Sequence, residues 1–367
     1  MLPFLTLLYL FPLSTAHPQS TLGNRNFPDP SITYDPSTDK WYAFATQSDD
    51  DIHVQVASSS SFPSGSDWTY LPRTDILPVP GKWVNSSQPE IWAPDVHFVN
   101  SSSSGKWVMY YSGLASGSGY HCIGTASTAS SSNASILGPY TADDEPFACP
   151  TSKGGAIDAS GFYDEQDDAR WVVYKVDGSA KGPGGPCGNG LPPGEPTPFM
   201  LQRVDARDGV TKVGEPIQIL DRDPELDGPL IEAPSLVKHV ARGGGDDDDD
   251  DNNDDHGRGG DRWVLFYSSH CFNSEEYDVR YAVSESGVEG PYKRMGQLIG
   301  KENGSYYDGL VAPGGASVIG QARGGINRNH GKGPCAMVFH ADCPAGRCMY
   351  QAEWVMGDDG VVDVVRG

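Results

Sequence analysis

The chain has 367 residues with a formal net charge of −23, and 37% of its residues are hydrophobic. This charge argues against nucleic acid or an anionic membrane as a partner, whereas a neutral ligand such as a sugar is unaffected by it. The 45 glycines and 29 prolines, with short aromatic and β-branched runs and no long amphipathic helix, indicate a turn-rich all-β protein.

The chain begins with an apolar segment, residues 1–16, that ends in Ser14-Thr15-Ala16. Small residues at positions 14 and 16 fit a secretory cleavage site, so we predict a signal peptide and a secreted, extracellular mature chain of residues 17–367. No other stretch is long and apolar enough to span a bilayer. Four N-x-S/T sequons support secretion as a glycoprotein. They begin at Asn85, Asn100, Asn133 and Asn303.

Seven cysteines follow the predicted cleavage site. In an oxidising compartment they predict up to three disulfides and one free thiol, with a connectivity that the sequence leaves open. Cys343 and Cys348 have a spacing found in metal sites, but no second pair completes one, so we expect a structural bridge there. Cys187 lies in a Gly/Pro-rich loop, residues 182–198, which we expect it to pin.

A strand led by tryptophan recurs along the chain. Copies occupy residues 40–45, 106–111, 170–175 and 262–267, and a degenerate fifth copy occupies residues 335–340. Each copy has strand-like segments before and after it, so the unit has three to four strands. Five such units indicate small sheets repeated around an axis, and we predict a five-bladed β-propeller as a single domain. A β-sandwich with an accessory domain is the alternative for short, evenly spaced strands.

One low-complexity insertion, residues 243–260, interrupts the fourth unit. Its run of glycine and aspartate predicts a solvated, disordered loop. It lacks the alternating acids and the glycine bend of a calcium-binding loop.

Acidic residues mark the first strands of units one, three and four, namely Asp29, Asp158 and Glu232. The innermost strand of each propeller blade lines the central channel, so acids at equivalent inner-strand positions are expected to converge at one end of it. Asp29 lies between two prolines that stiffen its backbone, which suits a base that aims a water molecule. Apolar neighbours raise the pKa of Glu232 and keep it protonated, and the nearby Asp158 raises that pKa further. An acid and a base that face each other across one water are typical of an inverting glycosidase.

Four motifs carry a resemblance to a known family. They are Pro28-Asp29-Pro30-Ser31-Ile32, Trp92-Ala93-Pro94-Asp95-Val96, Ala156-Ile157-Asp158 and Glu232-Ala233-Pro234-Ser235-Leu236. In this order and spacing the series resembles glycoside hydrolase family 43, over roughly residues 24–365. The resemblance implies a five-bladed propeller and an inverting mechanism, with Asp29 as general base, Asp158 as the residue that modulates pKa and orients, and Glu232 as general acid. It also implies plant cell-wall substrates, namely α-L-arabinofuranosides, arabinans and β-xylosides.

The resemblance implies no required cofactor and no metal ligand among the site residues. Many arabinan-cleaving members carry a histidine in the fifth unit that helps to hold a central calcium or water cluster. Here Gly315 stands at that position, which leaves a structural calcium in the channel as the weaker expectation. His340 is a further histidine expected near the channel, although a lone histidine beside a strand is more often structural.

Sugar binding needs aromatic side chains at the rim of the channel. Trp92, just before Asp95, and Phe162, after Asp158, are the candidates by position, and we group Trp92, Asp95 and Phe162 as expected substrate-binding residues. Either aromatic side chain can equally pack between blades, which is the commoner fate of a buried ring.

Two alternative functions remain open. Arg222-Asp223-Pro224 matches the Arg-Asp-Pro element of fructoside-cleaving relatives, but their general acid precedes a cysteine, whereas Glu232 precedes Ala233. A non-catalytic sugar-binding propeller is the other alternative, and such a binder has no need of a desolvated glutamate. We expect a monomer that acts on a plant oligo- or polysaccharide without a protein partner.

Overall fold

The structure is a computed structural model that describes residues 18–101, 104–240, 260–301, 307–320 and 335–365. The predicted signal peptide lies outside these residues, and so does the Gly/Asp-rich insertion apart from Gly260. None of the helices within the described ranges has the length and apolar character needed to cross a bilayer.

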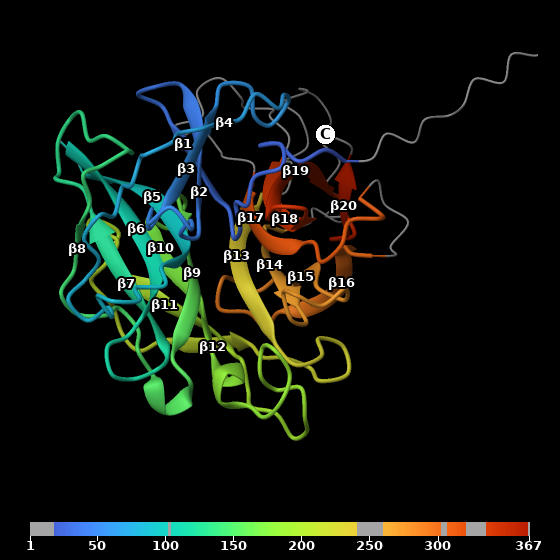
Figure 1. Ribbon diagram of the computed structural model, residues 1–367. Helices are drawn as coiled ribbons and strands as arrows, with labels where there is room; N and C mark the ends of the chain where they lie inside the picture. The colour runs from blue at the N-terminus through green and yellow to red at the C-terminus, as the bar shows by residue number, and fades with distance from the viewer. Residues whose placement is uncertain (1–17, 102–103, 241–259, 302–306, 321–334, 366–367) are drawn as a thin grey trace, which may run out of the picture.

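Five four-stranded antiparallel sheets follow one another along the described chain (Figure 1). The strands are β1 (Ser31–Asp35), β2 (Lys40–Ala45), β3 (Gln55–Ser59) and β4 (Thr69–Tyr70) in blade 1; β5 (Trp92–Ser101), β6 (Ser104–Leu114), β7 (His121–Ser127) and β8 (Thr141–Ala142) in blade 2; β9 (Ala156–Asp164), β10 (Ala169–Val176), β11 (Phe199–Val204) and β12 (Ile217–Leu220) in blade 3; β13 (Ile231–His239), β14 (Arg262–Ser269), β15 (Asp278–Ser284) and β16 (Lys293–Ile299) in blade 4; β17 (Gly314–Ile319), β18 (Cys335–Cys343), β19 (Gly346–Met356) and β20 (Val362–Val365) in blade 5. Two short 3-10 helices, η1 (Thr151–Lys153) and η2 (Gly178–Lys181), lie in loops on either side of β9 and β10. The predicted five-bladed β-propeller is confirmed, and each repeated segment is the second strand of its blade.

The first strand of each blade lies at the centre of the ring, because these strands contact one another from blade to blade, including β1 with β17. In Figure 1 the blue first blade accordingly lies beside the red fifth one. The segment before β1 helps to close the ring by binding to β19. The backbone N–H of Thr21 donates to the carbonyl of Met349 (2.9 Å), and that of Phe27 donates to the carbonyl of Arg347 (2.7 Å). Asp29, two residues beyond Phe27, is thereby placed beside blade 5.

Buried apolar side chains of the described residues form five clusters, one at each interface between neighbouring blades. Trp107 of β6, for example, is almost fully buried between blades 1 and 2. Trp41 of β2 packs in the cluster that joins blade 1 to blade 5. The tryptophan that recurs in the sequence is therefore a packing residue between sheets, which explains why it repeats.

The inner strand of every blade begins with one residue in the left-handed conformation, which we call the junction residue. The junction residues are Asp29, Ala93, Asp158, Ala233 and Gly315, with φ between 42° and 61°. In blades 2 to 5 the pairing of the first and second strands is irregular at this point. Such bulges bend a strand and re-aim its side chains.

Each junction residue donates its backbone N–H to a side chain of the preceding blade, across 2.9 to 3.1 Å. The acceptors are Thr46 for Ala93, Ser112 for Asp158, Asp158 for Ala233, Ser268 for Gly315, and His340 for Asp29. A buried N–H needs a partner, so these bonds fix where each inner strand enters the hub.

Candidate active site

A cavity of about 650 Å³ lies at the hub and is lined by residues of all five blades. This volume is within the range that takes up a ligand of drug size. Asp29, Asp158 and Glu232 all line it, as do Tyr277 and Arg347. The structure thus brings the three predicted acids to one place.

The three acids do not occupy equivalent positions, which corrects the expectation from sequence. Asp29 and Asp158 are junction residues, whereas Glu232 lies one residue before the junction residue Ala233. Trp92 holds the corresponding place in blade 2. Because a bulge at the junction residue re-aims the side chains of the strand, an acid at this residue or just before it can face the cavity.

Asp29 is held as a carboxylate. Its Oδ1 accepts from Nη1 of Arg347 (2.8 Å), and its Oδ2 accepts from the hydroxyl of Thr46 (2.7 Å). Burial alone would raise the pKa of this carboxyl, but the guanidinium of Arg347 and the other contacts outweigh burial and lower the pKa below its ordinary value. An ionised carboxylate with fixed geometry, whose side chain is 21% exposed, is suited to accept a proton from a water molecule.

Asp158, unlike Asp29, favours its protonated form. Its Oδ2 accepts the backbone N–H of Ala233 (3.0 Å), which places the carboxyl against the chain that carries Glu232. Burial and the neighbouring charge of Glu232 raise the pKa of Asp158 to about 8. Two carboxyls this closely coupled titrate as a pair, so the Asp158–Glu232 pair retains one proton across neutral pH.

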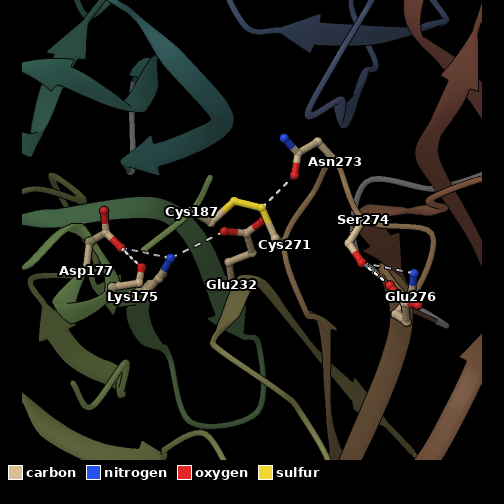
Figure 2. The surroundings of a disulfide bond; sticks show 9 residues. Lys175, Asp177, Cys187, Glu232, Cys271, Asn273, Ser274 and Glu276 are labelled. Atoms are coloured by element: carbon tan, nitrogen blue, oxygen red, sulfur yellow. Dashed lines mark hydrogen bonds and ion pairs between the residues drawn. A yellow bond between two sulfur atoms is a disulfide. The ribbon is translucent and has the colours of Figure 1, made fainter. Parts of the chain in front are cut away.

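Glu232 lies on β13 with only 12% of its side chain exposed. Burial raises its pKa, although the Lys175 ammonium and a hydrogen bond from Tyr277 act in the opposite direction. Lys175 lies between Glu232 and Asp177 (Figure 2). Burial of Glu232 therefore favours its protonated form, and Lys175 and Tyr277 stabilise the anion once the proton has left.

The fifth blade does not fit the central calcium of some arabinan-cleaving relatives. A Cβ at Gly315 would lie 2.6 Å from Cε1 of His340, so His340 fills the space that a residue-315 side chain would take. Burial lowers the pKa of His340 to about 3, which leaves the ring neutral. Its Nδ1 accepts the N–H of Asp29 (3.0 Å), so Nε2 carries the hydrogen and cannot bind a cation. In the described ranges, no group of three or more His, Cys, Asp or Glu is placed to hold a metal ion.

The three expected substrate-binding residues have different surroundings. Trp92 lines the cavity and stacks on His121, with ring centroids 3.6 Å apart. Asp95 also borders the cavity, but its Oδ2 accepts from the N–H of Gly161 (2.7 Å) and contacts Nε2 of His97 (2.6 Å), so that oxygen joins blades 2 and 3. Phe162 is 7% exposed and packs in the cluster between blades 3 and 4, away from the residues that line the cavity.

A disulfide holds the loop that forms one wall of the cavity. Residues 185–188 line the cavity, and Cys187 is bonded to Cys271 at the end of β14. Figure 2 shows this bond in the surroundings of Glu232. The expectation that Cys187 pins its loop is confirmed, and so is the Cys343–Cys348 bridge. Cys122 pairs with Cys149, and Cys335 is buried.

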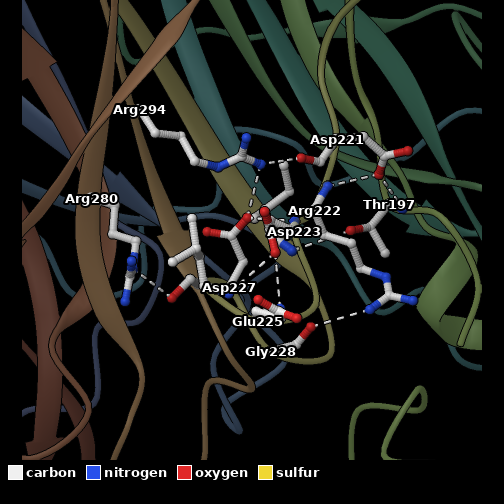
Figure 3. Close-up of polar contacts among 12 residues, drawn as sticks. Thr197, Asp221, Arg222, Asp223, Glu225, Asp227, Gly228, Arg280 and Arg294 are labelled. Atoms are coloured by element: carbon white, nitrogen blue, oxygen red, sulfur yellow. Dashed lines mark hydrogen bonds and ion pairs between the residues drawn. The ribbon is translucent and has the colours of Figure 1, made fainter. Parts of the chain in front are cut away.

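The segment that leads into β13 is fixed by buried polar contacts (Figure 3). Asp227 is fully buried, and its Oδ2 accepts from Nη2 of Arg294 (2.9 Å) and from the N–H of Asp223 (2.7 Å). Arg222 donates to the carbonyl of Gly228 (3.2 Å). The guanidinium of Arg222 thus donates to loop carbonyls, and Arg222 is not among the residues that line the cavity.

Sequence reasoning missed Arg347, Tyr277, Thr46 and Lys175. Arg347 and Tyr277 lie in or beside third strands, where no acidic motif or repeat drew attention to them. Lys175 ends one tryptophan-led segment and Thr46 directly follows another, but counting from the tryptophan does not align them. Thr46, Ser112 and Ser268 lie five residues after their tryptophans, whereas Lys175 lies four residues after Trp171. The strand register, in which Lys175 lies opposite Ile157 as Ser112 lies opposite Trp92, is what reveals the lysine.

The profile of the glycosyl hydrolases family 43 matches residues 20–241. No sequence among curated proteins matches the chain. Among solved structures, a thermostable family-43 glycoside hydrolase is 20% identical, with 96% of each chain covered and a TM-score of 0.68. An exo-1,5-α-L-arabinanase from a bovine ruminal metagenomic library is 20% identical, with 94% of this chain and 98% of that chain covered and a TM-score of 0.60. An α-L-arabinofuranosidase from Lactobacillus brevis is 16% identical, with 95% of each chain covered and a TM-score of 0.62.

Proposed function

Because the chain belongs to glycosyl hydrolase family 43, we propose that it hydrolyses arabinofuranosyl or xylosyl linkages of plant cell-wall polysaccharides with inversion at the anomeric carbon. Members of the family are glycosidases. The similarity to an arabinanase and an arabinofuranosidase supports this choice of sugars.

One observation carries the proposal. A single cavity holds Asp29 in its ionised form and, in the Asp158–Glu232 pair, a proton that persists to about pH 8. Glycoside hydrolysis with inversion needs this division between a base and an acid in one site. A site that only binds sugar gains nothing from keeping carboxyls in opposite protonation states.

The reaction follows from these states. Asp29 accepts a proton from water as the water oxygen attacks the anomeric carbon. Glu232 gives its proton to the glycosidic oxygen as the bond between that oxygen and the anomeric carbon breaks. Asp158 shares its proton with Glu232, and Lys175 and Tyr277 stabilise the Glu232 carboxylate that remains. The general acid and general base return to their starting states by exchange with solvent.

The sugar that is cleaved needs a surface to stack on, and Trp92 is the residue we propose for this role. Its ring stacks on that of His121, whose Nε2 lies 3.0 Å from Oε2 of Glu90, so these contacts hold the ring in place. Aromatic faces bind the apolar face of a sugar ring by dispersion and exclusion of water.

We further propose that the protein is secreted through cleavage after residue 16 and acts as a monomer. Three disulfides support an oxidising compartment. The sequon residues Asn100 and Asn133 are exposed, as glycosylation requires. Mass spectrometry of the secreted protein, with and without glycosidase treatment, would identify its first residue and its glycans, and light scattering would give its oligomeric state.

Glu232→Gln tests the proposal most directly. The amide has the size of the carboxyl but no proton to give, so hydrolysis of arabinan or xylan oligosaccharides should fall by about 10²–10⁴-fold. Their binding, measured by calorimetry, should persist. Aryl glycosides with an acidic leaving group need less protonation, so the loss on these substrates should be smaller. Equal losses on both substrate types would exclude Glu232 as the general acid.

Proton NMR of the first sugar released tests the stereochemistry. The product should have the anomeric configuration opposite to that of the substrate, because one water attacks in a single displacement. Retention would indicate a covalent intermediate and would overturn the assignment of Asp29 as a base. A wild-type protein that binds but never cleaves arabinan, xylan and aryl glycosides would instead support the sugar-binding alternative.

A further inference from the structure

Blade 3 departs from the others at the end of its second strand. In blades 1, 2, 4 and 5 this position holds Thr46, Ser112, Ser268 or His340, each of which accepts the N–H of the next junction residue. Lys175 holds the position in blade 3, since it pairs with Ile157 in the register in which Ser112 pairs with Trp92. An ammonium group only donates hydrogen bonds. The next junction residue, Ala233, therefore donates its N–H to the Asp158 carboxyl instead.

The ammonium of Lys175 contacts the carboxyl groups of two residues. Only 1% of the Lys175 side chain is exposed, and its Nζ lies 2.9 Å from Oδ1 of Asp177 and 3.3 Å from Oε2 of Glu232 (Figure 2). The hydroxyl of Ser179 donates to the same oxygen of Asp177 (2.5 Å), which fixes the counter-ion. One fixed carboxylate suffices to neutralise a buried lysine, so the second contact, to Glu232, calls for a separate explanation.

We propose that Lys175 is a positioning residue that acts through Glu232: it fixes one oxygen of this carboxyl, and together with its counter-ion Asp177 it sets how readily Glu232 releases its proton. This inference rests on the proposed role of Glu232 as general acid. The other blades have a hydroxyl or imidazole acceptor at this position, and a lysine replaces it only in the blade that precedes Glu232. This one lysine thus accounts for two contacts: the N–H of Ala233 donates to the Asp158 carboxyl, and the Lys175 ammonium contacts Glu232.

The charges around Glu232 determine the direction of the expected effects. The groups that face it are Asp29, Asp158, Lys175, Asp177, Tyr277 and Arg347. Lys175 favours the anion of Glu232, whereas Asp177 disfavours it. Asp177 and Glu232 raise the pKa of Lys175 in spite of burial, so it stays charged. His121 also faces Asp177, and burial lowers the pKa of His121, so it is neutral on the basic side of the profile.

The test compares the basic limb of the kcat/KM pH profile in three variants. Lys175→Met removes the cation and should move this limb to higher pH by roughly one unit, with a lower kcat because Oε2 is no longer held. Asp177→Asn leaves the cation unopposed and should move the limb to lower pH. The double variant removes both charges at nearly constant volume. Its basic limb should lie between those of the wild type and Lys175→Met. If Lys175 and Asp177 only stabilised the fold, the basic limbs of the three variants would not follow this order.

Lys238→Met is the matched control. Lys238 lies on β13, the strand of Glu232, is 10% exposed and pairs with Asp164 (2.9 Å). Six residues along a strand separate it from Glu232 by roughly 20 Å. Its loss should lower the melting temperature without moving the limb. A shift like that of Lys175→Met, or shifts of equal sign in Lys175→Met and Asp177→Asn, would overturn the proposal.

A readout without turnover separates this inference from the proposed function. The carboxyl carbon of Glu232, labelled with ¹³C and assigned by its absence in Glu232→Gln, should titrate in the same order across the variants. If the wild type proves inactive, the proposed function fails, and the titration still decides the role of Lys175. Unchanged titration in a folded Asp177→Asn protein would refute that role even if all variants lose activity.

Discussion

Asp29 and Asp158 occupy the same position in two blades and have opposite protonation. Both are junction residues with left-handed backbones, φ 52° and 57°, and both line the hub cavity. Yet the pKa of Asp29 lies below its ordinary value, whereas that of Asp158 is raised to about 8. The repeated strand decides where each carboxyl lies, and its neighbours decide whether it is charged.

Those neighbours come from different places. Arg347, on the third strand of blade 5, reaches Asp29 because the segment before β1 is bound to β19. The carboxyl of Asp158 receives a backbone N–H and faces Glu232, a like charge. Closure of the ring thus supplies the cation that makes one aspartate a base, and the blade 3–blade 4 junction supplies the second carboxyl with which the other aspartate shares a proton.

Asp29→Asn should have the largest effect, because it removes the base that the comparison rests on. We expect kcat to fall by about 10²–10⁴-fold with little change in substrate binding. Azide needs no deprotonation, so it should restore turnover and form a glycosyl azide by attack of its nitrogen on the anomeric carbon. Mass spectrometry detects this product. Failure of azide to help Asp29→Asn, or equal rescue of Glu232→Gln, would count against Asp29 as the base.

Asp158→Asn should reduce activity less, by roughly 10–100-fold, since it removes a partner of the acid and not the acid itself. Glu232 would then hold its proton alone beside Lys175, so the basic limb of kcat/KM should move to lower pH. A limb that stays in place would rule out a shared proton.

The same variant should change how stability depends on pH. The folded-state pKa of Asp158 is raised, so its contribution is complete below the unfolded value near 3.8 and is lost as pH rises to about 8. Asn can accept the Ala233 N–H but does not ionise. Melting temperatures of Asp158→Asn should therefore decline less than those of the wild type between pH 4 and pH 8, and exceed them at pH 8 by a few degrees.

Arg347→Met should move the acid limb of kcat/KM to higher pH by roughly one unit, because the cation that keeps Asp29 ionised is gone. The maximal value of kcat/KM should change by a smaller factor than the proton concentration at which the acid limb falls. Arg280→Met is a suitable control: Arg280 also pairs with a buried aspartate, Asp278, at 2.8 Å, and neither of them lines the cavity. An acid limb that moves equally in both variants would mean that the effect comes from lost stability.

The comparison also shows what sequence could reveal. The fold and the three acids were predictable, because blade packing repeats the tryptophan-led strand and the acids stand next to proline or small residues at strand entrances. The protonation states were not, because Arg347 lies 318 residues from Asp29 and meets it only after ring closure. Phe162 was chosen by its position after Asp158, but four residues along β9 separate the two by roughly 13 Å, and Phe162 lies in the packing between blades 3 and 4.

Thr46→Val should have the smallest effect on activity, and it is the sharpest test of why Asp29 and Asp158 differ in protonation. Its hydroxyl donates to Oδ2 of Asp29 (2.7 Å) and accepts the N–H of Ala93 (3.0 Å). Valine has the same shape without the donor, so the pKa of Asp29 should rise and the acid limb should move up by roughly half a unit. Ser112→Ala changes the corresponding position of blade 2, where the hydroxyl accepts the N–H of Asp158. That variant loses a junction bond too, but its acid limb should stay in place. If the acid limb moved by the same amount in Thr46→Val and in Ser112→Ala, the charge of Asp29 would depend on the rigidity of the hub and not on the hydrogen bond from Thr46.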